Sequence, residues 1–213
     1  MRCDVLTLFP QAFEWYLSQV HIQAAVKLGH EFRLTNYRDH TPLTHLQVDD
    51  TPYGGGAGMV LRVDVVAAAL EAAYGLQPKH RVIALTPQGR PLTQAIVEEL
   101  AEEEELTLLS SRFEGFDDRI VQHLCSDSIS IGPYVLSNGD LAAMVVLDAV
   151  ARRLPGALAE GSGELESFSV ELDGALEYPH YTRPAEFRGW SVPDVLLSGD
   201  HAKIESWRRE HVR

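Results

Sequence analysis

Three short turns hold the residues best suited to bind a ligand. They span residues 86–90, 111–115 and 132–140, and each follows an apolar run of the length expected for a buried strand. Ligands of parallel α/β sheets bind at the carboxyl ends of the strands. Three irregular turns at one such edge predict a shared pocket. The alternative is that each turn is an ordinary strand-to-helix connection.

The third turn, within residues 130–141, carries the most information. Gly139 is expected at positive φ, and Asn138 tolerates the left-handed region better than most residues. Asp140 suits the N-cap or the first turn of the apolar helix that follows. Such a turn leaves backbone N–H and C=O groups exposed beside an apolar wall. This arrangement could hold a flat heterocycle such as adenine.

A glycine cluster, residues 54–58, ends a long polar segment that runs from residue 37 to residue 59. The cluster lacks the Lys-Ser/Thr pair and the spacing of a phosphate-binding loop. Four glycines in five residues require either a sharp bend or a close approach to a ligand or another chain. A flexible tether is the alternative interpretation.

The elements that must position these turns are readable from the hydrophobic pattern. Strand-like runs at 3–9, 31–36, 81–86, 106–110 and around 129 alternate with helical runs at 10–17, 22–28, 63–74, 93–104, 118–123 and 141–154. This alternation predicts an α/β fold with a largely parallel sheet.

The last third of the chain differs in composition. Residues 155–178 are rich in Gly, Ser, Glu and Ala, which is typical of a linker of low order. Residues 179–213 are too aromatic for a disordered tail, and Asp200 is a good N-cap for a final helix to about Glu210. One short helix cannot form a core, so this tail must pack on something else.

Composition limits the class of protein. The chain has 213 residues, of which 45% are hydrophobic, and no apolar run is long enough to span a membrane. Two cysteines, Cys3 and Cys125, are too few for a disulfide framework or a zinc site, and the N-terminus has no signal-peptide layout. These features predict a cytoplasmic protein with no membrane partner.

The charge balance has two interpretations. The net charge of −13, taken for the whole chain, argues against a nucleic-acid partner. Residues 179–213, however, contain six Lys or Arg and five Asp or Glu, so the acidic excess lies in the rest of the chain. A local basic face can still bind phosphate.

Seven motifs, in order along the whole chain, carry a resemblance to a known family. They are Leu8-Phe9-Pro10, the segment from Asp49 to Met59, Pro87-Gln88-Gly89-Arg90, the segment from Arg112 to Asp117, the segment from Ser130 to Leu136, the segment from Pro179 to Pro184 and the segment from Val195 to His201. The sequence resembles the bacterial tRNA (guanine-N1)-methyltransferases of the SPOUT superfamily.

The resemblance implies a SPOUT-type parallel sheet with helices on both faces and a deep trefoil knot. It implies a knotted domain at 1–158, a flexible linker at 159–177 and a partial, short helical tRNA-binding domain at 178–213. Members transfer a methyl group from S-adenosylmethionine to N1 of the guanine just 3′ of the tRNA anticodon, position 37. They act as homodimers with the active site between subunits. Many members require Mg²⁺, although no dedicated protein metal site is visible here.

The implied cofactor site agrees with the three turns. Backbone groups of residues 131–136 would hold the adenine, Leu85 and Leu136 would sandwich it, and Glu114 would lie near the methionine end. An exposed helix-start carboxylate is the alternative for Glu114. The cofactor residues are Leu85, Thr86, Pro87, Ser111, Glu114, Ile131, Gly132, Pro133, Tyr134, Val135, Leu136, Asn138 and Gly139.

The implied catalytic residues are Glu166 and Arg152. Glu166 stands where the family has an aspartate that removes the proton from guanine N1, and Arg152 would neutralise charge on guanine O6. Taken alone, they would be a solvated linker residue and a helix-end arginine. The resemblance places Tyr53, Gly56, His180, Tyr181, Arg183 and His201 toward the RNA or the partner subunit.

Several positions depart from the family pattern. Ser111 and Asn138 stand where glycine is usual, Asp140 where glutamate is usual and Thr51 where arginine is usual, and Pro133 replaces an aspartate and removes one N–H donor. Two rival hypotheses follow: a methyltransferase of the same fold acting on another RNA, or a catalytically weak RNA- or cofactor-binding protein.

Overall fold

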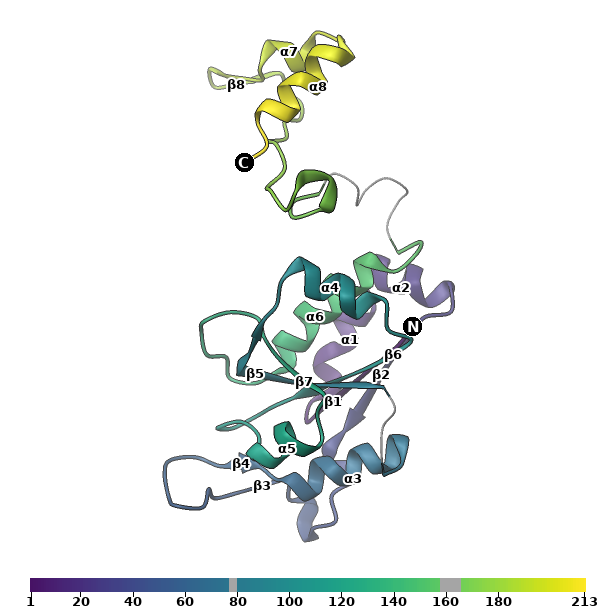
Figure 1. The fold of residues 1–213 in the computed structure, drawn as a ribbon, viewed down its shortest axis with the longest axis vertical. Coiled ribbons are helices and arrows are strands. Elements are labelled where there is room, and N and C mark those ends of the chain that lie inside the picture. Colours follow the sequence, from purple (N-terminus) through teal and green to yellow (C-terminus); the bar gives the residue numbers. More distant parts are fainter. Residues whose placement is uncertain (77–79, 158–165) are drawn as a thin grey trace. The chain divides into compact units, whose positions relative to one another are not determined.

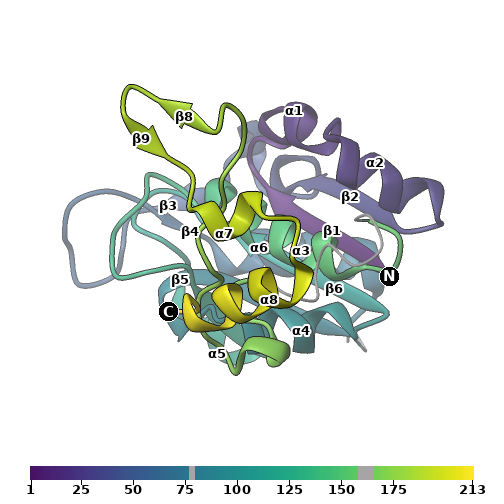
Figure 2. The ribbon, with the colours of Figure 1, turned by 90° about the horizontal axis from the view of Figure 1, so that it is seen from above.

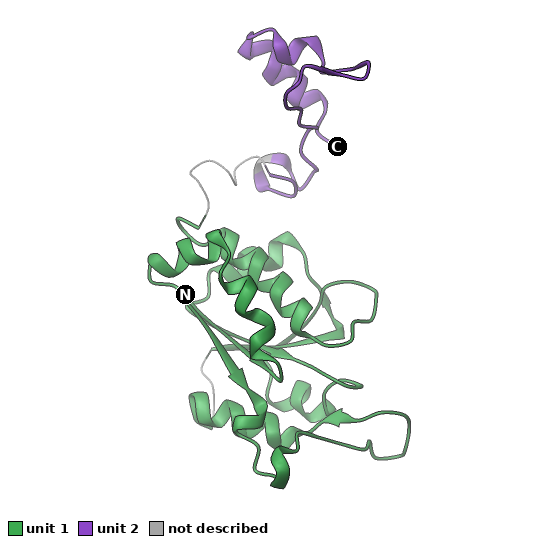
Figure 3. Cartoon of the chain, turned by 180° about the vertical axis from the view of Figure 1, so that it is seen from behind, with its two compact units in different colours: residues 1–158 green, residues 159–213 purple. Residues whose placement is uncertain are grey.

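The structure, a computed structural model, describes residues 1–76, 80–157 and 166–213. The chain forms two compact units, Met1–Leu158 and Ala159–Arg213 (Figure 3). Each unit is described by itself below.

A five-stranded parallel sheet organises the first unit. Its order is β2-β1-β6-β5-β7, and every neighbouring pair is parallel. The strands are β1 (Arg2–Thr7), β2 (Glu31–Asn36), β5 (Arg81–Pro91), β6 (Glu105–Ser110) and β7 (Asp127–Ser130). The central strands β1 and β6 are buried along nearly their whole length, which explains their continuous apolar sequence. The predicted α/β class is confirmed.

Helices cover both faces of this sheet (Figure 1). One face carries η1 (Pro10–Phe13), α1 (Glu14–Leu17), α2 (Val20–Lys27), α4 (Gln94–Ala101) and α6 (Asp140–Arg153), whose apolar side chains form one core cluster. The other carries α3 (Val63–Tyr74) and α5 (Asp118–His123), which form a second cluster. Helix α2 lies beside the edge strand β2 (Figure 2).

Two boundaries differ from the sequence prediction by three residues or more. Helix α4 ends at Ala101 and not near Glu104, because a run of carboxylates at a helix C-terminus opposes the helix dipole. Strand β5 does not end at Thr86. Its pairing with β7 is interrupted after Leu85 and resumes at Arg90, so the predicted turn is a loop set within the strand.

The glycine cluster connects a small antiparallel pair, β3 (Asp49–Asp50) and β4 (Val60–Leu61). The polar segment before it contains two short 3₁₀ turns, η2 (Tyr37–Asp39) and η3 (Thr44–Leu46). The expected long loop is therefore partly ordered by local turns.

The second unit contains η4 (Val170–Leu172), the hairpin β8 (Glu186–Phe187) and β9 (Trp190–Ser191), α7 (Asp194–Leu197) and α8 (His201–Glu210). Asp200 caps α8 by accepting a hydrogen bond from the Lys203 N–H, as predicted. Residues 158–165 of the predicted linker lie outside the described residues. Its later part closes on itself, since the Phe168 N–H donates to the Ala175 carbonyl at 2.8 Å.

Across the described ranges, no helix combines the length and the apolarity needed to cross a membrane.

Candidate functional site

A cavity opens where β5 is interrupted after Leu85 and at the carboxyl ends of β6 and β7. These three strands are neighbours in the sheet, in the order β6-β5-β7. The cavity is lined by Leu85, Thr86, Pro87, Ser111, Ile129, Ser130, Ile131, Gly132, Tyr134, Leu136, Asn138, Gly139 and Ala142. All three turns singled out in the sequence therefore share one cavity, as predicted, although the first of them lies within β5 and not at its end.

The lining differs in detail from the predicted cofactor residues. Glu114, Pro133 and Val135 do not line the cavity among the described residues, and the Val135 side chain is exposed. Conversely, the sequence reasoning missed Ile129, Ser130 and Ala142, which line it. Their positions in the sequence could have identified them, because Ile129 and Ser130 are the last residues of β7 and Ala142 is a small residue in the first turn of α6.

The prediction of a positive φ at Gly139 in the third turn is wrong. Its φ is −82°, and Asn138 likewise does not adopt positive φ. Glycine is needed there for a different reason: a Cβ would lie 2.7 Å from the Ser111 nitrogen. The Asn138 Oδ1 accepts a hydrogen bond from the Asp140 N–H at 3.0 Å, which fixes the entry into α6. Close packing of two turns selects this glycine.

The backbone of residues 131–136 is partly paired within the turn. The Tyr134 hydroxyl donates to the Ile131 carbonyl at 3.2 Å, and the Tyr134 N–H donates to the Gly132 carbonyl at 3.0 Å. Within the described part of the chain, the N–H groups of Val135 and Leu136 donate to no protein acceptor. These two donors beside the apolar Leu136 side chain suit a flat heterocycle.

Asp140 joins three elements behind the cavity. Its side chain is buried, and its Oδ1 accepts hydrogen bonds from the Thr7 and Ser110 hydroxyls, both at 2.6 Å. The carboxylate also lies at the N-terminus of α6, where the helix dipole favours negative charge. The ends of β1 and β6 and the start of α6 are thereby held together.

The glycine cluster is tied to the second turn. The Glu114 N–H donates to the Met59 carbonyl at 2.9 Å, and a Cβ on Gly58 would overlap the Glu114 carboxylate. The close approach at Gly58 is therefore to Glu114 of the same chain, and an approach to a ligand or another chain stays a prediction. Earlier in the same loop, Gly56 is exposed and the Tyr53 side chain is 100% exposed.

The two predicted catalytic residues belong to different units. Arg152 lies in the last turn of α6, ten positions after the cavity-lining Ala142, which corresponds to about 15 Å of helix rise. Glu166 begins the closed loop of the second unit, where its carbonyl accepts a hydrogen bond from the Ser169 N–H.

The predicted RNA-facing residues of the second unit are on its surface. His180 Nε2 lies 2.8 Å from the Glu177 carboxylate, and Tyr181 packs edge-on against Trp207 with ring centroids 6.3 Å apart. Arg183 and His201 are exposed. In the described residues, no group of three or more His, Cys, Asp or Glu side chains is arranged to hold a metal ion.

Comparison with known proteins identifies the family. A family model described as tRNA (guanine-1)-methyltransferase TrmD matches residues 1–213. Curated relatives named tRNA (guanine-N(1)-)-methyltransferase include one from Brevibacillus brevis, 54% identical over 98% of this chain and 85% of the relative, and one from Geobacter metallireducens, 50% identical over the same shares. A third, from Dehalococcoides mccartyi, is 48% identical over 99% of this chain and 85% of the relative. The chain therefore belongs to the tRNA (guanine-1)-methyltransferase family.

Proposed function

We propose that this protein transfers a methyl group from S-adenosylmethionine to N1 of the guanine just 3′ of the tRNA anticodon, position 37. The main observation behind the proposal is that residues of all three turns line one cavity, in a chain that belongs to this family. Relatives that share about half of its residues are named tRNA (guanine-N(1)-)-methyltransferase.

The cavity residues fit an adenosine-containing cofactor. Leu85 and Leu136 provide apolar walls, and the Leu136 N–H provides a donor. Pro133 has no backbone N–H, so the hydrogen-bond donors to the adenine must come from neighbouring residues. The bound cofactor would supply an electrophilic methyl group.

Guanine N1 carries a proton at neutral pH, so the reaction needs a base. We assign this role to Glu166. Its carboxylate would take the N1 proton while the N1 electron pair forms the bond to the methyl carbon and the cofactor sulfur keeps the electrons of the broken bond. The glutamate is one methylene longer than the family aspartate, and positioning at this level matters for rate.

Arg152 would neutralise the negative charge that develops on guanine O6. The distance of about 15 Å along α6 between Arg152 and the cavity supports an active site shared by two copies of the chain. Leu141 and Val145, one turn apart on α6, are 57% and 44% exposed and offer an apolar face to a second copy. Homodimerisation is thus part of the proposal.

A deep trefoil knot around the cavity is also part of the proposal. It is supported by the family membership. A magnesium requirement remains a prediction from the family resemblance.

The test is methyl transfer from labelled S-adenosylmethionine to two tRNA transcripts that differ only in guanine or adenine at position 37. Label on the guanine transcript alone is the expected result. Label on both transcripts, or only on another RNA, would favour the rival methyltransferase hypothesis. Cofactor binding without transfer to any RNA would favour the weak binding protein.

A further inference from the structure

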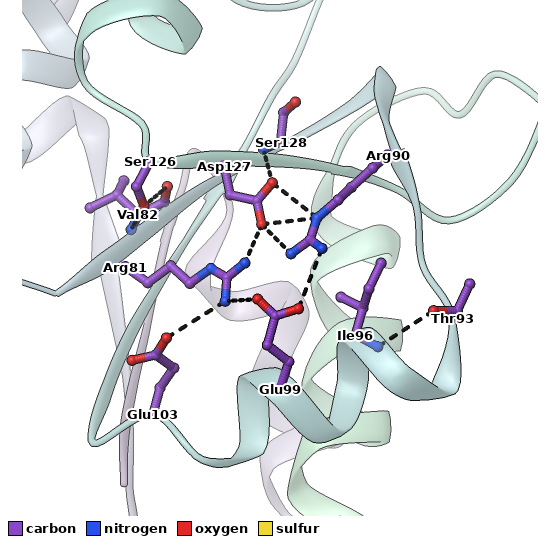
Figure 4. A network of polar contacts seen from close by, with 10 residues as sticks. All are labelled: Arg81, Val82, Arg90, Thr93, Ile96, Glu99, Glu103, Ser126, Asp127 and Ser128. Carbon is purple, nitrogen blue, oxygen red and sulfur yellow. Dashed lines mark hydrogen bonds and ion pairs between the residues drawn. The ribbon is translucent and has the colours of Figure 1, made fainter.

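A charged network outside the cavity joins β5, β7 and α4 (Figure 4). Arg90 donates from Nε and Nη2 to the Asp127 carboxylate, at 3.1 and 2.6 Å. Arg81 donates to the same carboxylate at 2.6 Å and to Glu99 at 2.6 Å. Glu99 also accepts from Arg90 at 3.4 Å. Arg81 and Arg90 of β5 thus both donate to Asp127 of the neighbouring strand β7.

The two arginines lie on opposite sides of the interruption in β5. Leu85 and Arg90 both pair with Ile129 of β7, so residues 86–89 leave the sheet and return to the same point. Thr86 and Pro87 of this loop line the cavity. Arg90 is therefore the first residue after the loop whose Thr86 and Pro87 form this wall of the cavity.

Close packing leaves the returning end of the loop little freedom. A Cβ on Gly89 would lie 2.5 Å from the Ile129 nitrogen, so the backbone of the loop lies directly on β7. The paired N–H groups of a guanidinium fix both the distance and the direction of its carboxylate partner. The Arg90–Asp127 pair is thus able to set the orientation of the loop as well as anchor it.

The charge balance of the network favours this geometry. Burial of Asp127 opposes its charged form, but hydrogen bonds from Arg90 and Arg81 keep the pKa of its carboxyl below the ordinary value. Its side chain is only 13% exposed. Loss of Arg90 alone would leave Asp127 paired with Arg81, so the carboxylate would stay compensated and the strand would stay in place.

We propose that Arg90 is a positioning residue for the cofactor: by its paired hydrogen bonds to Asp127 it holds the 86–89 loop as a wall of the cavity and so sets the affinity for S-adenosylmethionine. This inference rests on the proposed function. Arg90 itself does not line the cavity among the described residues, and it acts through Thr86 and Pro87.

The binding experiment compares Arg90→Ala, Arg90→Lys and Arg33→Ala with the unaltered protein. Calorimetry with S-adenosylmethionine and its demethylated product should show an affinity about tenfold lower for Arg90→Ala, since one charge-assisted pair is lost. Arg90→Lys should be intermediate because it keeps the charge but not the paired geometry. Arg33 forms an ion pair with Glu31 on the far edge strand β2, so Arg33→Ala should bind normally.

The kinetic pattern separates positioning from general loosening. Arg90→Ala should raise the KM for the cofactor and leave the KM for tRNA unchanged. An affinity of Arg90→Ala within twofold of the unaltered protein would overturn the inference. A parallel rise of both KM values would overturn it as well.

A second experiment does not depend on the cofactor. Amide hydrogen exchange of the ligand-free protein should be faster in Arg90→Ala over residues 86–91 and unchanged over β6. Unchanged exchange over 86–91 would overturn the inference. If the unaltered protein fails to bind the cofactor, the proposed function fails, and this exchange experiment still decides whether Arg90 holds the loop.

Discussion

At the scale of single residues, Glu166 carries the chemistry of the proposal. Glu166→Gln should bind S-adenosylmethionine normally and lose methyl transfer, because the amide cannot accept the N1 proton. Calorimetry and labelled transfer measure the two properties separately. Glu166→Asp, which restores the family residue, should keep activity. Near-normal turnover of Glu166→Gln would refute the assignment of the base.

Gly139 tests the packing of the cavity. Gly139→Ala should destabilise the fold by about 1–3 kcal/mol and weaken cofactor binding, because the new methyl group meets backbone atoms of residues 110 and 111. Urea unfolding gives the first value and calorimetry the second. Ser137→Ala, an exposed change in the same turn, is the control and should alter stability by less than about 0.5 kcal/mol. Equal stability of the two variants would contradict the close approach.

At the scale of elements, the Asp127 carboxylate links β7 to β5 in a pH-dependent way. Hydrogen bonds from the arginines outweigh burial and lower its folded-state pKa below the ordinary 3.8, so its stabilising effect is complete above pH 3.8 and is lost as pH falls through the folded-state pKa. Asp127→Asn should therefore cost about 1–3 kcal/mol at pH 7. The difference from the unaltered protein should shrink steadily below about pH 4.

Urea unfolding of both proteins between pH 3 and pH 7 measures this difference. Asp118→Asn, a change of an exposed carboxylate on α5, controls for the altered net charge. A stability difference that stays constant down to pH 3 would show that the charge of Asp127 does not contribute.

At the scale of the whole molecule, the proposed active site is shared by two copies of the chain. Light scattering at micromolar concentration should give a dimer of the 23.6 kDa chain. Replacing Leu141 and Val145 together by Asp should give monomers without transfer activity, because the exposed apolar face of α6 becomes charged. A monomeric unaltered protein that is fully active would refute the shared site.

The alternation of strands and helices, the cap at Asp200 and the positions of the three turns could be predicted from the sequence alone. These depend on local spacing, which the hydrophobic period and turn residues encode directly. The seven motifs also led to the family, which the comparisons then showed. Localisation in the cytoplasm, the metal requirement and the roles of Glu166 and Arg152 stay predictions.

The contacts that join the turns became visible only in the folded structure. Asp140 reaches Thr7, which lies 133 positions earlier, and Gly139 is required by Ser111 and not by its own φ. The return of β5 to Ile129 and the role of Arg90 likewise depend on contacts between distant segments. Such contacts form only when the sheet brings strand ends together, so no local pattern in the sequence could reveal them.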